Sequence, residues 1–200
     1  MTKVQEILNF WFGDIKDDWP KTDRNPMWWF GGQEVDRQII ERFSELVQQA
    51  KRKELDGWKH TAQGRLALII LLDQFSRNIF RKTPQAFESD EYALSLSREG
   101  IAAGLDKDLS LIERVFFYMP FMHSERLVDH DDSIGLYRQI INEAKVEHHE
   151  QAQRYFGAAK MHQELIVQFG RYPHRNAILF RTSTEQEIEY LRDAEKFGQG

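Results

Sequence analysis

The chain has 200 residues, of which 41% are hydrophobic and 30% charged, so its composition is that of a globular protein and excludes a disordered or low-complexity one. It contains no cysteine, which excludes disulfide frameworks, thiol nucleophiles and thiolate metal sites. The formal net charge of −5 argues against a nucleic-acid-binding protein, which would carry an excess of basic residues.

The N-terminal segment and the longest apolar run give no sign of export or of a membrane anchor. Residues 1–12 lack the small-residue cleavage site of a signal peptide. The longest apolar run, residues 66–72, is far shorter than the roughly 20 residues that span a bilayer. We therefore expect a cytoplasmic protein without a membrane partner.

Several segments carry apolar residues at spacings of three and four, which is typical of amphipathic or buried helices. The first is residues 35–50, which Gly57 is expected to end, and the second is residues 61–80, whose dense apolar run predicts a buried helix. Further helices are expected at residues 90–103, 109–119, 133–144, 147–168 and 184–197. The last begins with the capping-box spacing of Thr184 and Glu187.

The pattern predicts an all-α fold, because no segment shows the alternation of a strand and because short turns would join the helices into stacked antiparallel hairpins. No linker divides the chain, so residues 1–200 are expected to form one domain. Residues 13–32 would form an aromatic-rich irregular segment packed on the helices. The aromatic residues between Phe10 and Phe30 favour a hydrophobic plug, although a lid or a stacking platform for a planar ligand is the alternative.

The first candidate site is the motif DQFSRNIFR at residues 73–81. Asp73, Arg77 and Arg81 are spaced by four and are expected to share one helix face beside the most apolar part of the chain. They could form a chain of ion pairs, or Asp73 could orient Arg77 towards an anionic ligand. Spacing alone does not separate these two interpretations.

The second candidate lies around Pro120, which is expected to bend the chain after the preceding helix. The aromatic run before it would then deliver His123, Ser124 and Glu125 into a turn. Ser124 could cap the next helix. Alternatively, His123 is a general acid or base with Glu125 as its partner, because imidazole titrates near neutral pH.

The third candidate is a cationic stretch from residue 167 to residue 183, which has no acidic residue and is followed by an acidic segment. It contains Arg171, His174, Arg175 and Arg181. Arginine forks suit carboxylates and phosphates, so the stretch could bind a small anion. Alternatively, these side chains bond the free carbonyls at a helix C-terminus.

Other kinds of site have little support. The histidines and acidic residues show no strong metal-ligand spacing, so no metal ion or other cofactor is expected. The sequence contains no glycine-rich phosphate loop, no Gly-x-Ser-x-Gly and no His-Glu-x-x-His motif. These observations argue against P-loop NTPases, α/β-hydrolases and the common zinc peptidases.

Four motifs together resemble a bacterial family catalogued as a domain of unknown function, number 924. They are residues 7–13 (ILNFWFG), 73–81, 118–125 (YMPFMHSE) and 169–176 (FGRYPHRN). The resemblance covers nearly the whole chain and implies a single all-helical domain related to tetratricopeptide-repeat folds, with no established activity. The family usually has Gly before the last arginine of the set; Phe180 stands here instead and would narrow the space beside Arg181.

Residues and resemblance together predict a polar pocket where the 61–80 helix, the bend at Pro120 and the 171–176 loop meet. The predicted residues that bind a small anionic molecule are Asp73, Gln74, Arg77, Arg81, Arg171, Arg175, Asn176 and Arg181. His123 with Glu125, or His174, would transfer protons if the protein is an enzyme. The alternatives are a tetratricopeptide-like module that binds a peptide or protein without catalysis, or motifs that serve only as polar scaffolding.

Overall fold

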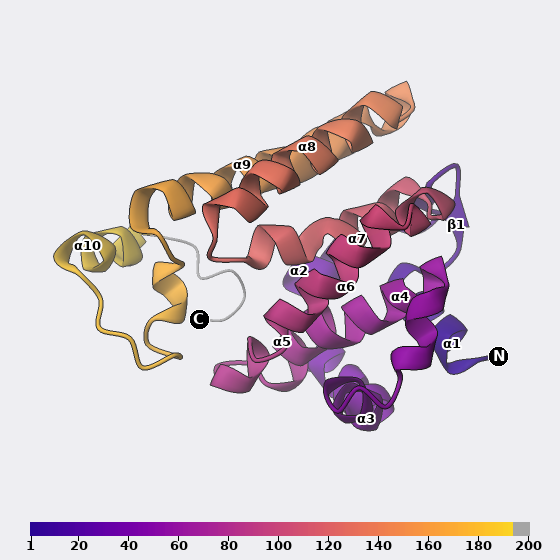
Figure 1. The fold of residues 1–200 in the computed structure, drawn as a ribbon, viewed down its shortest axis with the longest axis horizontal. Coiled ribbons are helices and arrows are strands. Elements are labelled where there is room, and N and C mark those ends of the chain that lie inside the picture. Colours follow the sequence, from indigo (N-terminus) through magenta and orange to yellow (C-terminus); the bar gives the residue numbers. More distant parts are fainter. Residues whose placement is uncertain (194–200) are drawn as a thin grey trace.

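The computed structural model describes residues 1–193, most of which are helical (Figure 1). The longer helices are α1 Lys3–Phe12, α2 Asn25–Phe30, α3 Gly32–Lys51, α4 Ala62–Ile69, α5 Ser76–Ile79, α6 Asp90–Ala102, α7 Leu111–His123, α8 Leu127–Glu143, α9 His149–Phe169 and α10 Glu185–Asp193. The short helical turns are η1 Asp56–His60, η2 Ile70–Phe75, η3 Pro84–Ala86, η4 Leu105–Asp108, η5 Val146–His148 and η6 Pro173–Arg175. The strands are β1 Ile15–Lys16 and β2 Trp19–Pro20.

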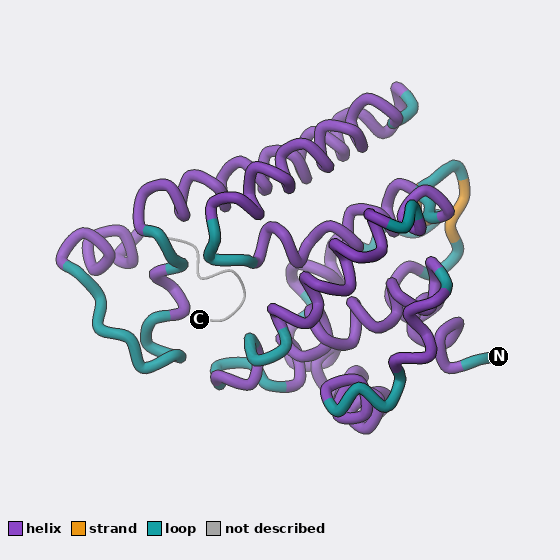
Figure 2. The backbone as a smooth tube through the Cα atoms, in the orientation of Figure 1, coloured by secondary structure: helices purple, strands orange, loops and turns teal. Residues whose placement is uncertain are grey.

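The all-α prediction is confirmed, since the two short strands are the only extended pairing in residues 1–193 (Figure 2). Helices α8 and α9 lie side by side, and α7 packs between α8 and α6 (Figure 1). Helix α3 packs on η2 and α5, and α1 packs on α4. None of the helices in the described part of the chain is long and apolar enough to cross a membrane.

The predicted helix at residues 61–80 is confirmed as one continuous rod formed by α4, η2 and α5. Thr61 caps its start by accepting the backbone N–H of Gly64 at 3.1 Å. All residues from Leu66 to Leu72 are fully buried, as the apolar run predicts. The turn η2 is a π-helix, an irregularity often found at functional sites, and it contains Asp73.

Helix α7 continues through Pro120 as far as His123, so the expectation that the helix stops before this proline is wrong. A proline inside a helix costs about 3 kcal/mol or more. The side chains on either side of it, from Val115 to Met122, are buried, and each apolar one contributes about 1.5–3 kcal/mol. This burial offsets the lost hydrogen bond and brings His123 to the end of a rigid helix.

The N-terminal aromatic residues pack into the core, in agreement with the plug. Trp11, Phe12, Trp19 and Trp28 are buried, whereas Phe30 is 82% exposed. The indole N–H of Trp28 donates to the carbonyl of Trp11 at 3.1 Å. The N-terminal segment therefore closes one end of the helical core.

The β1–β2 hairpin within residues 13–32 was not expected from the sequence. Its strands pair Ile15 with Pro20 and Lys16 with Trp19, which is too short a ladder to show alternation. Asp17 and Asp18 form the turn with positive φ values of 51° and 69°, the region that two-residue hairpins require. An Asp-Asp turn lacks the glycine that usually marks such hairpins in a sequence.

Two other boundaries show where sequence signals are strong and weak. Helix α3 ends at Lys51, before Gly57, so this glycine does not terminate it. At α10 the capping box is present: the N–H of Thr184 donates to the Glu187 carboxylate at 2.7 Å, and the N–H of Glu187 donates to the Thr184 hydroxyl at 3.2 Å. The last residues of the expected 184–197 helix lie outside the described residues.

Candidate functional site

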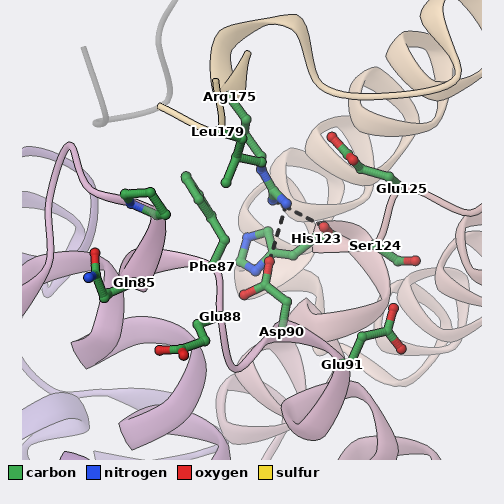
Figure 3. A pocket seen from close by; sticks show the side chains of 11 residues that line it. Gln85, Phe87, Glu88, Asp90, Glu91, His123, Ser124, Glu125, Arg175 and Leu179 are labelled. Atoms are coloured by element: carbon green, nitrogen blue, oxygen red, sulfur yellow. Dashed lines mark hydrogen bonds and ion pairs between the residues drawn. The ribbon is translucent and has the colours of Figure 1, made fainter. Parts of the chain in front are cut away.

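A pocket of about 470 Å³ lies between the start of α6, the end of α7 and the segment that follows α9 (Figure 3). Its lining residues are Pro84, Gln85, Phe87, Glu88, Asp90, Glu91, His123, Ser124, Glu125, Arg175 and Leu179. Three elements distant in the sequence therefore contribute to one cavity, which is lined by three of the predicted site residues, His123, Glu125 and Arg175.

Asp73 on η2 holds His123 in place behind the pocket. Its Oδ1 lies 2.7 Å from Nδ1 of His123, and its carboxylate is fully buried. Burial alone would raise the pKa of the Asp73 carboxyl, but the charges of Arg77 and His123 outweigh it and hold this pKa well below its usual range. Asp73 is therefore ionised near neutral pH and can only accept a hydrogen bond.

The ionised Asp73 determines which nitrogen of His123 carries the proton. Because a carboxylate is an acceptor, Nδ1 of His123 must be the donor, and Nε2 of the neutral ring is then an unprotonated acceptor. Burial lowers the pKa of His123 below its usual value, the Asp73 carboxylate opposes this shift, and Arg77 adds to it. The imidazole is therefore neutral near pH 7, and its Nε2 has no hydrogen-bond partner among residues 1–193.

Arg77 and Asp90 continue this network across the pocket wall. NH1 of Arg77 lies 3.0 Å from Oδ1 of Asp73 and donates to the Asp73 carbonyl at 2.7 Å. NH2 of Arg77 donates to Oδ2 of Asp90 at 3.0 Å, and Arg175 donates to the same oxygen at 3.2 Å. Asp90 thus links the two arginines, a role that no spacing in the sequence indicates.

Arg175 is held rigidly between two aromatic rings. Its guanidinium carbon lies 4.6 Å from the ring centroid of Phe87 and 4.7 Å from that of Tyr172. NH2 of Arg175 donates to the carbonyl of His123 at 3.0 Å. The alternative in which a loop arginine bonds helix carbonyls is therefore correct for Arg175, but the helix is α7 rather than the neighbouring α9.

Other side chains also satisfy carbonyls at the C-terminal end of α7, which a helix leaves without internal partners. The hydroxyl of Tyr172 donates to the carbonyl of Met122, and Nε2 of His130 lies 2.8 Å from the carbonyl of Ser124. These bonds come from the residue that precedes η6 and from α8. They attach the C-terminal part of the chain to the wall of the pocket.

Glu125 is not the partner of His123, so this expectation is wrong. Its carboxylate accepts hydrogen bonds from Arg181 at 2.6 Å and from the backbone N–H of Tyr172 at 2.8 Å. Burial would raise the pKa of Glu125, but these two donors lower it. Ser124 does not cap α8 either; its hydroxyl donates to Asp129.

Arg81 does not share the face of Asp73 and Arg77, contrary to expectation. Helix α5 ends at Ile79, and the chain turns before it reaches Arg81. Its guanidinium donates to the carboxylate of Asp36 on α3 at 2.8 Å. Arg81 therefore joins two helices outside the pocket.

The other predicted residues support the loop or the network rather than line the cavity. Gln74 donates to the Asp73 carboxylate, and Arg171 pairs with Glu187 on α10 at 2.7 Å. Asn176 is buried and donates to Ser183 at 3.0 Å. His174 packs its ring 5.3 Å from that of Tyr172.

The cationic stretch is neutralised in three dimensions by carboxylates from other elements. Each predicted arginine forms an ion pair: Arg77 with Asp73 and Asp90, Arg81 with Asp36, Arg171 with Glu187, Arg175 with Asp90, and Arg181 with Glu125. Phe180 is 88% exposed, so it does not crowd Arg181 as expected. Within residues 1–193, no three histidine or acidic side chains converge in a way that could hold a metal ion.

Comparisons with known proteins agree with the motifs. Residues 7–195 match the model of a family described as bacterial protein of unknown function, DUF924. A solved structure of a protein of unknown function from Agrobacterium tumefaciens is similar, with 34% identity, a TM-score of 0.77, and coverage of 96% of this chain and 97% of that one. Among curated proteins there is no match. The chain therefore belongs to the bacterial DUF924 family.

Proposed function

We propose that the pocket binds a small molecule with an anionic group and that His123 acts on this molecule as a general base. One observation carries the proposal: Asp73 holds Nδ1 of His123 at 2.7 Å, and the side chain of His123 lines the pocket with Nε2 available. A neutral imidazole fixed in this way can accept a proton from a substrate or from water. Since the hydroxyl of Ser124 donates to Asp129, a serine nucleophile fits the site less well.

Arg175 supports the anionic part of the proposal. It lines the cavity, and its guanidinium plane is fixed by Phe87 and Tyr172, which lowers the entropy lost when a forked hydrogen bond forms. Glu88 and Glu91 lie on the same cavity and would repel a ligand with many negative charges. The ligand is therefore small and carries a single anionic group.

The proposal is tested by replacing His123 with glutamine, which is polar but cannot act as a base. The protein is incubated in D₂O with a mixture of small carboxylic acids, amino acids and their esters, and the loss or deuteration of each compound is followed by NMR. We expect at least one compound to react, and His123→Gln to slow that reaction by about 100-fold or more.

His149→Gln is the matched control, because His149 is an exposed histidine at the start of α9. A reaction that keeps its full rate in His123→Gln would contradict the proposal. Peptide binding that does not depend on His123, in the absence of any reaction, would favour the interaction module instead.

A further inference from the structure

The C-terminal segment, residues 171–193, forms one wall of the pocket, because Arg175 and Leu179 belong to it. We infer that acid releases this wall: the segment is docked on the end of α7 at neutral pH and detaches as the pH falls, while the rest of the fold stays intact. The inference goes beyond the proposed function, since it holds whatever the pocket binds.

The C-terminal segment is attached to α7 and its neighbours largely through hydrogen bonds and ion pairs. These run from Tyr172 to the Met122 carbonyl and Glu125, from Arg175 to Asp90 and the His123 carbonyl, and from Arg181 to Glu125. The apolar residues at this junction form a small cluster that is separate from the main core: Leu165, Ile166, Phe169, Tyr172 and Tyr190. Figure 1 shows α10 at one end of the molecule, beyond the end of α9. The segment can therefore detach as a local opening that leaves the main core buried.

Histidines from four elements gather at the buried centre of this junction. Tyr172 is fully buried, and the rings of His130 on α8, His162 on α9 and His174 on η6 lie between 5.3 and 6.2 Å from its ring. His123 on α7 lies 6.4 Å from His162. Detachment of the segment takes Tyr172 and His174 out of the cluster and brings the histidine rings into contact with water.

His130 has no acceptor for a second proton while the segment is docked. Its Nε2 lies 2.8 Å from the Ser124 carbonyl, which can only accept, so Nε2 is the donor and Nδ1 of the neutral ring is unprotonated. Nδ1 is buried and has no hydrogen-bond partner among residues 1–193. Protonation of His130 would therefore bury a charged N–H group without a partner, which is costly.

The charged groups that face the histidine cluster are already paired with one another. Four carboxylates each have an arginine partner: Asp73 with Arg77, Asp90 with Arg175, Glu125 with Arg181, and Asp129 with Arg126. Asp131 is exposed and accepts a hydrogen bond from Gln163 at 2.8 Å. A new imidazolium in the cluster would thus lie beside paired carboxylates and several arginines.

The titration of these groups agrees with the geometry. Burial and, to a lesser extent, the charge of Arg175 lower the pKa of His174 to about 3. Burial also lowers the pKa of His162 to about 3. The donors Arg181 and Tyr172 hold the pKa of Glu125 below its usual value, so this carboxylate keeps its charge at pH 5. Proton uptake by histidines is therefore the change that loosens the junction.

The direction and size of the effect follow from proton linkage. A histidine that is released into water has an ordinary pKa of about 6.5, so the detached state binds protons below this pH and the docked state does not. Acid therefore favours the detached state. At pH 5, each released histidine whose docked pKa is near 3 shifts the docking equilibrium about 30-fold towards detachment.

The inference is tested by amide hydrogen exchange of the complete protein, followed by NMR at pH 7.5 and pH 5.0 without a ligand. The N–H of Tyr172 is the reporter, because it donates to Glu125 across the junction at 2.8 Å, and the amides of the buried residues 66–72 report on the core. After correction for intrinsic exchange rates, Tyr172 should be less protected than the core. Its protection should fall about 30-fold or more between pH 7.5 and pH 5.0, while the core amides remain protected at pH 5.0.

Two variants assign the effect to the histidines. His174→Gln on the C-terminal segment and His162→Gln on α9 keep a polar side chain that cannot be protonated, and each should make the fall in Tyr172 protection smaller, by up to about 30-fold. They lie on different elements, so the test still stands if one of them fails to fold. His149→Gln, at an exposed histidine, is the matched control and should leave the fall unchanged.

Three results would overturn the inference. Equal protection of Tyr172 and the core at both pH values would mean that the segment detaches only when the whole protein unfolds. Protection of Tyr172 that does not change with pH would remove the acid response. A fall that is as large in both variants as in the native protein would assign it to other groups. The reaction of His123 is measured separately, so none of these results decides the proposed function.

Discussion

Asp73 is buried and ionised because donors from three residues converge on its carboxylate: Arg77, His123 and the side-chain amide of Gln74. Removing one member of a buried ionic network costs more than the interaction contributes, since the remaining charge is left without a partner. In this network the remaining charge would be Arg77, which loses the ion pair with Asp73 but keeps its bonds to Asp90 and to the Asp73 backbone carbonyl. Asp73 therefore positions His123 and also stabilises the fold.

Asp73→Asn is expected to change both the pKa of His123 and the stability of the fold. The pKa of His123 should fall further below its usual value, because the Asp73 carboxylate raises it in the native protein. The free energy of unfolding should fall by about 3–5 kcal/mol. Histidine-labelled NMR titration measures the first effect and urea denaturation the second, with Asp131→Asn, on the exposed face of α8, as the control. A His123 pKa that rises in Asp73→Asn would contradict the assignment of the dyad.

Phe180 occupies a backbone position that favours glycine. After η6, the N–H of Arg181 donates to the carbonyl of Asn176 at 2.8 Å, and the N–H of Phe180 donates to that of Ala177 at 3.4 Å. This pair of bonds is a Schellman motif, whose C′ residue takes a left-handed conformation, and Phe180 has φ = 55°. A glycine would take this conformation without strain, so backbone geometry accounts for the glycine that the resemblance implies at this position.

Phe180→Gly is expected to stabilise the protein. The phenylalanine is strained by about 1 kcal/mol in this conformation, and because its ring is exposed, the substitution removes little packing. The free energy of unfolding should therefore rise by about 0.5–1 kcal/mol, measured by urea denaturation. Val167→Gly, an exposed position within α9, should instead destabilise the protein by about the same amount. Destabilisation by Phe180→Gly would show that the ring makes a contact that stabilises the fold.

Short sequence patterns predict where the helices lie, but they predict the irregular turns within and between the helices less well. The buried 61–80 helix follows from the dense apolar run and the Thr61 cap, and the start of α10 follows from the capping box. Two features have no local signal: the passage of α7 through Pro120, which depends on burial between α6 and α8, and the π turn that contains Asp73. Both arise from packing between elements, which a single stretch of sequence does not contain.

Four histidines gather in the body of the molecule around Tyr172. The rings of His130, His162 and His174 lie 6.2, 5.6 and 5.3 Å from the Tyr172 ring, and the His123 ring lies 6.4 Å from that of His162. Burial lowers the pKa of His162 and of His174 to about 3, and it also lowers those of His123 and His130. The folded protein thus keeps these rings neutral where the unfolded chain would protonate them.

Stability is therefore expected to fall as the pH decreases below about 6.5. Each such histidine binds a proton in the unfolded state before the folded state does, so the loss of stability begins as the pH falls through about 6.5. For His162 and His174 this loss continues down to their folded pKa values of about 3. Each one adds up to about 1.4 kcal/mol per pH unit to the slope. Urea denaturation between pH 7.5 and pH 5 measures this slope. His162→Gln should reduce the slope by the contribution of one histidine, up to about 1.4 kcal/mol per pH unit. A free energy of unfolding that is constant over this range would contradict the assignment.

The residues of the site were easier to predict from sequence than their partners. The motifs identify His123 and Arg175, which line one pocket, and Asp73 and Arg77, which lie behind it. The motifs do not identify Asp90 or Tyr172 as site residues. They also do not show that His123 is held by Asp73 and not by Glu125. The side-chain contacts concerned join residues up to 85 positions apart in the sequence. Side-chain pairing of this kind depends on the packing of α6, α7 and η6 together.

The bonds that Tyr172 and Arg175 make to the end of α7 also determine at which stage of synthesis and folding the pocket is complete. During synthesis the helices up to α9 precede η6, so a growing chain has much of its core before it has the Arg175 wall of the cavity. The proposed ligand would then bind only chains whose C-terminal segment has docked on α7. By mass action, its presence would protect completed molecules from proteases and leave unfinished ones unprotected.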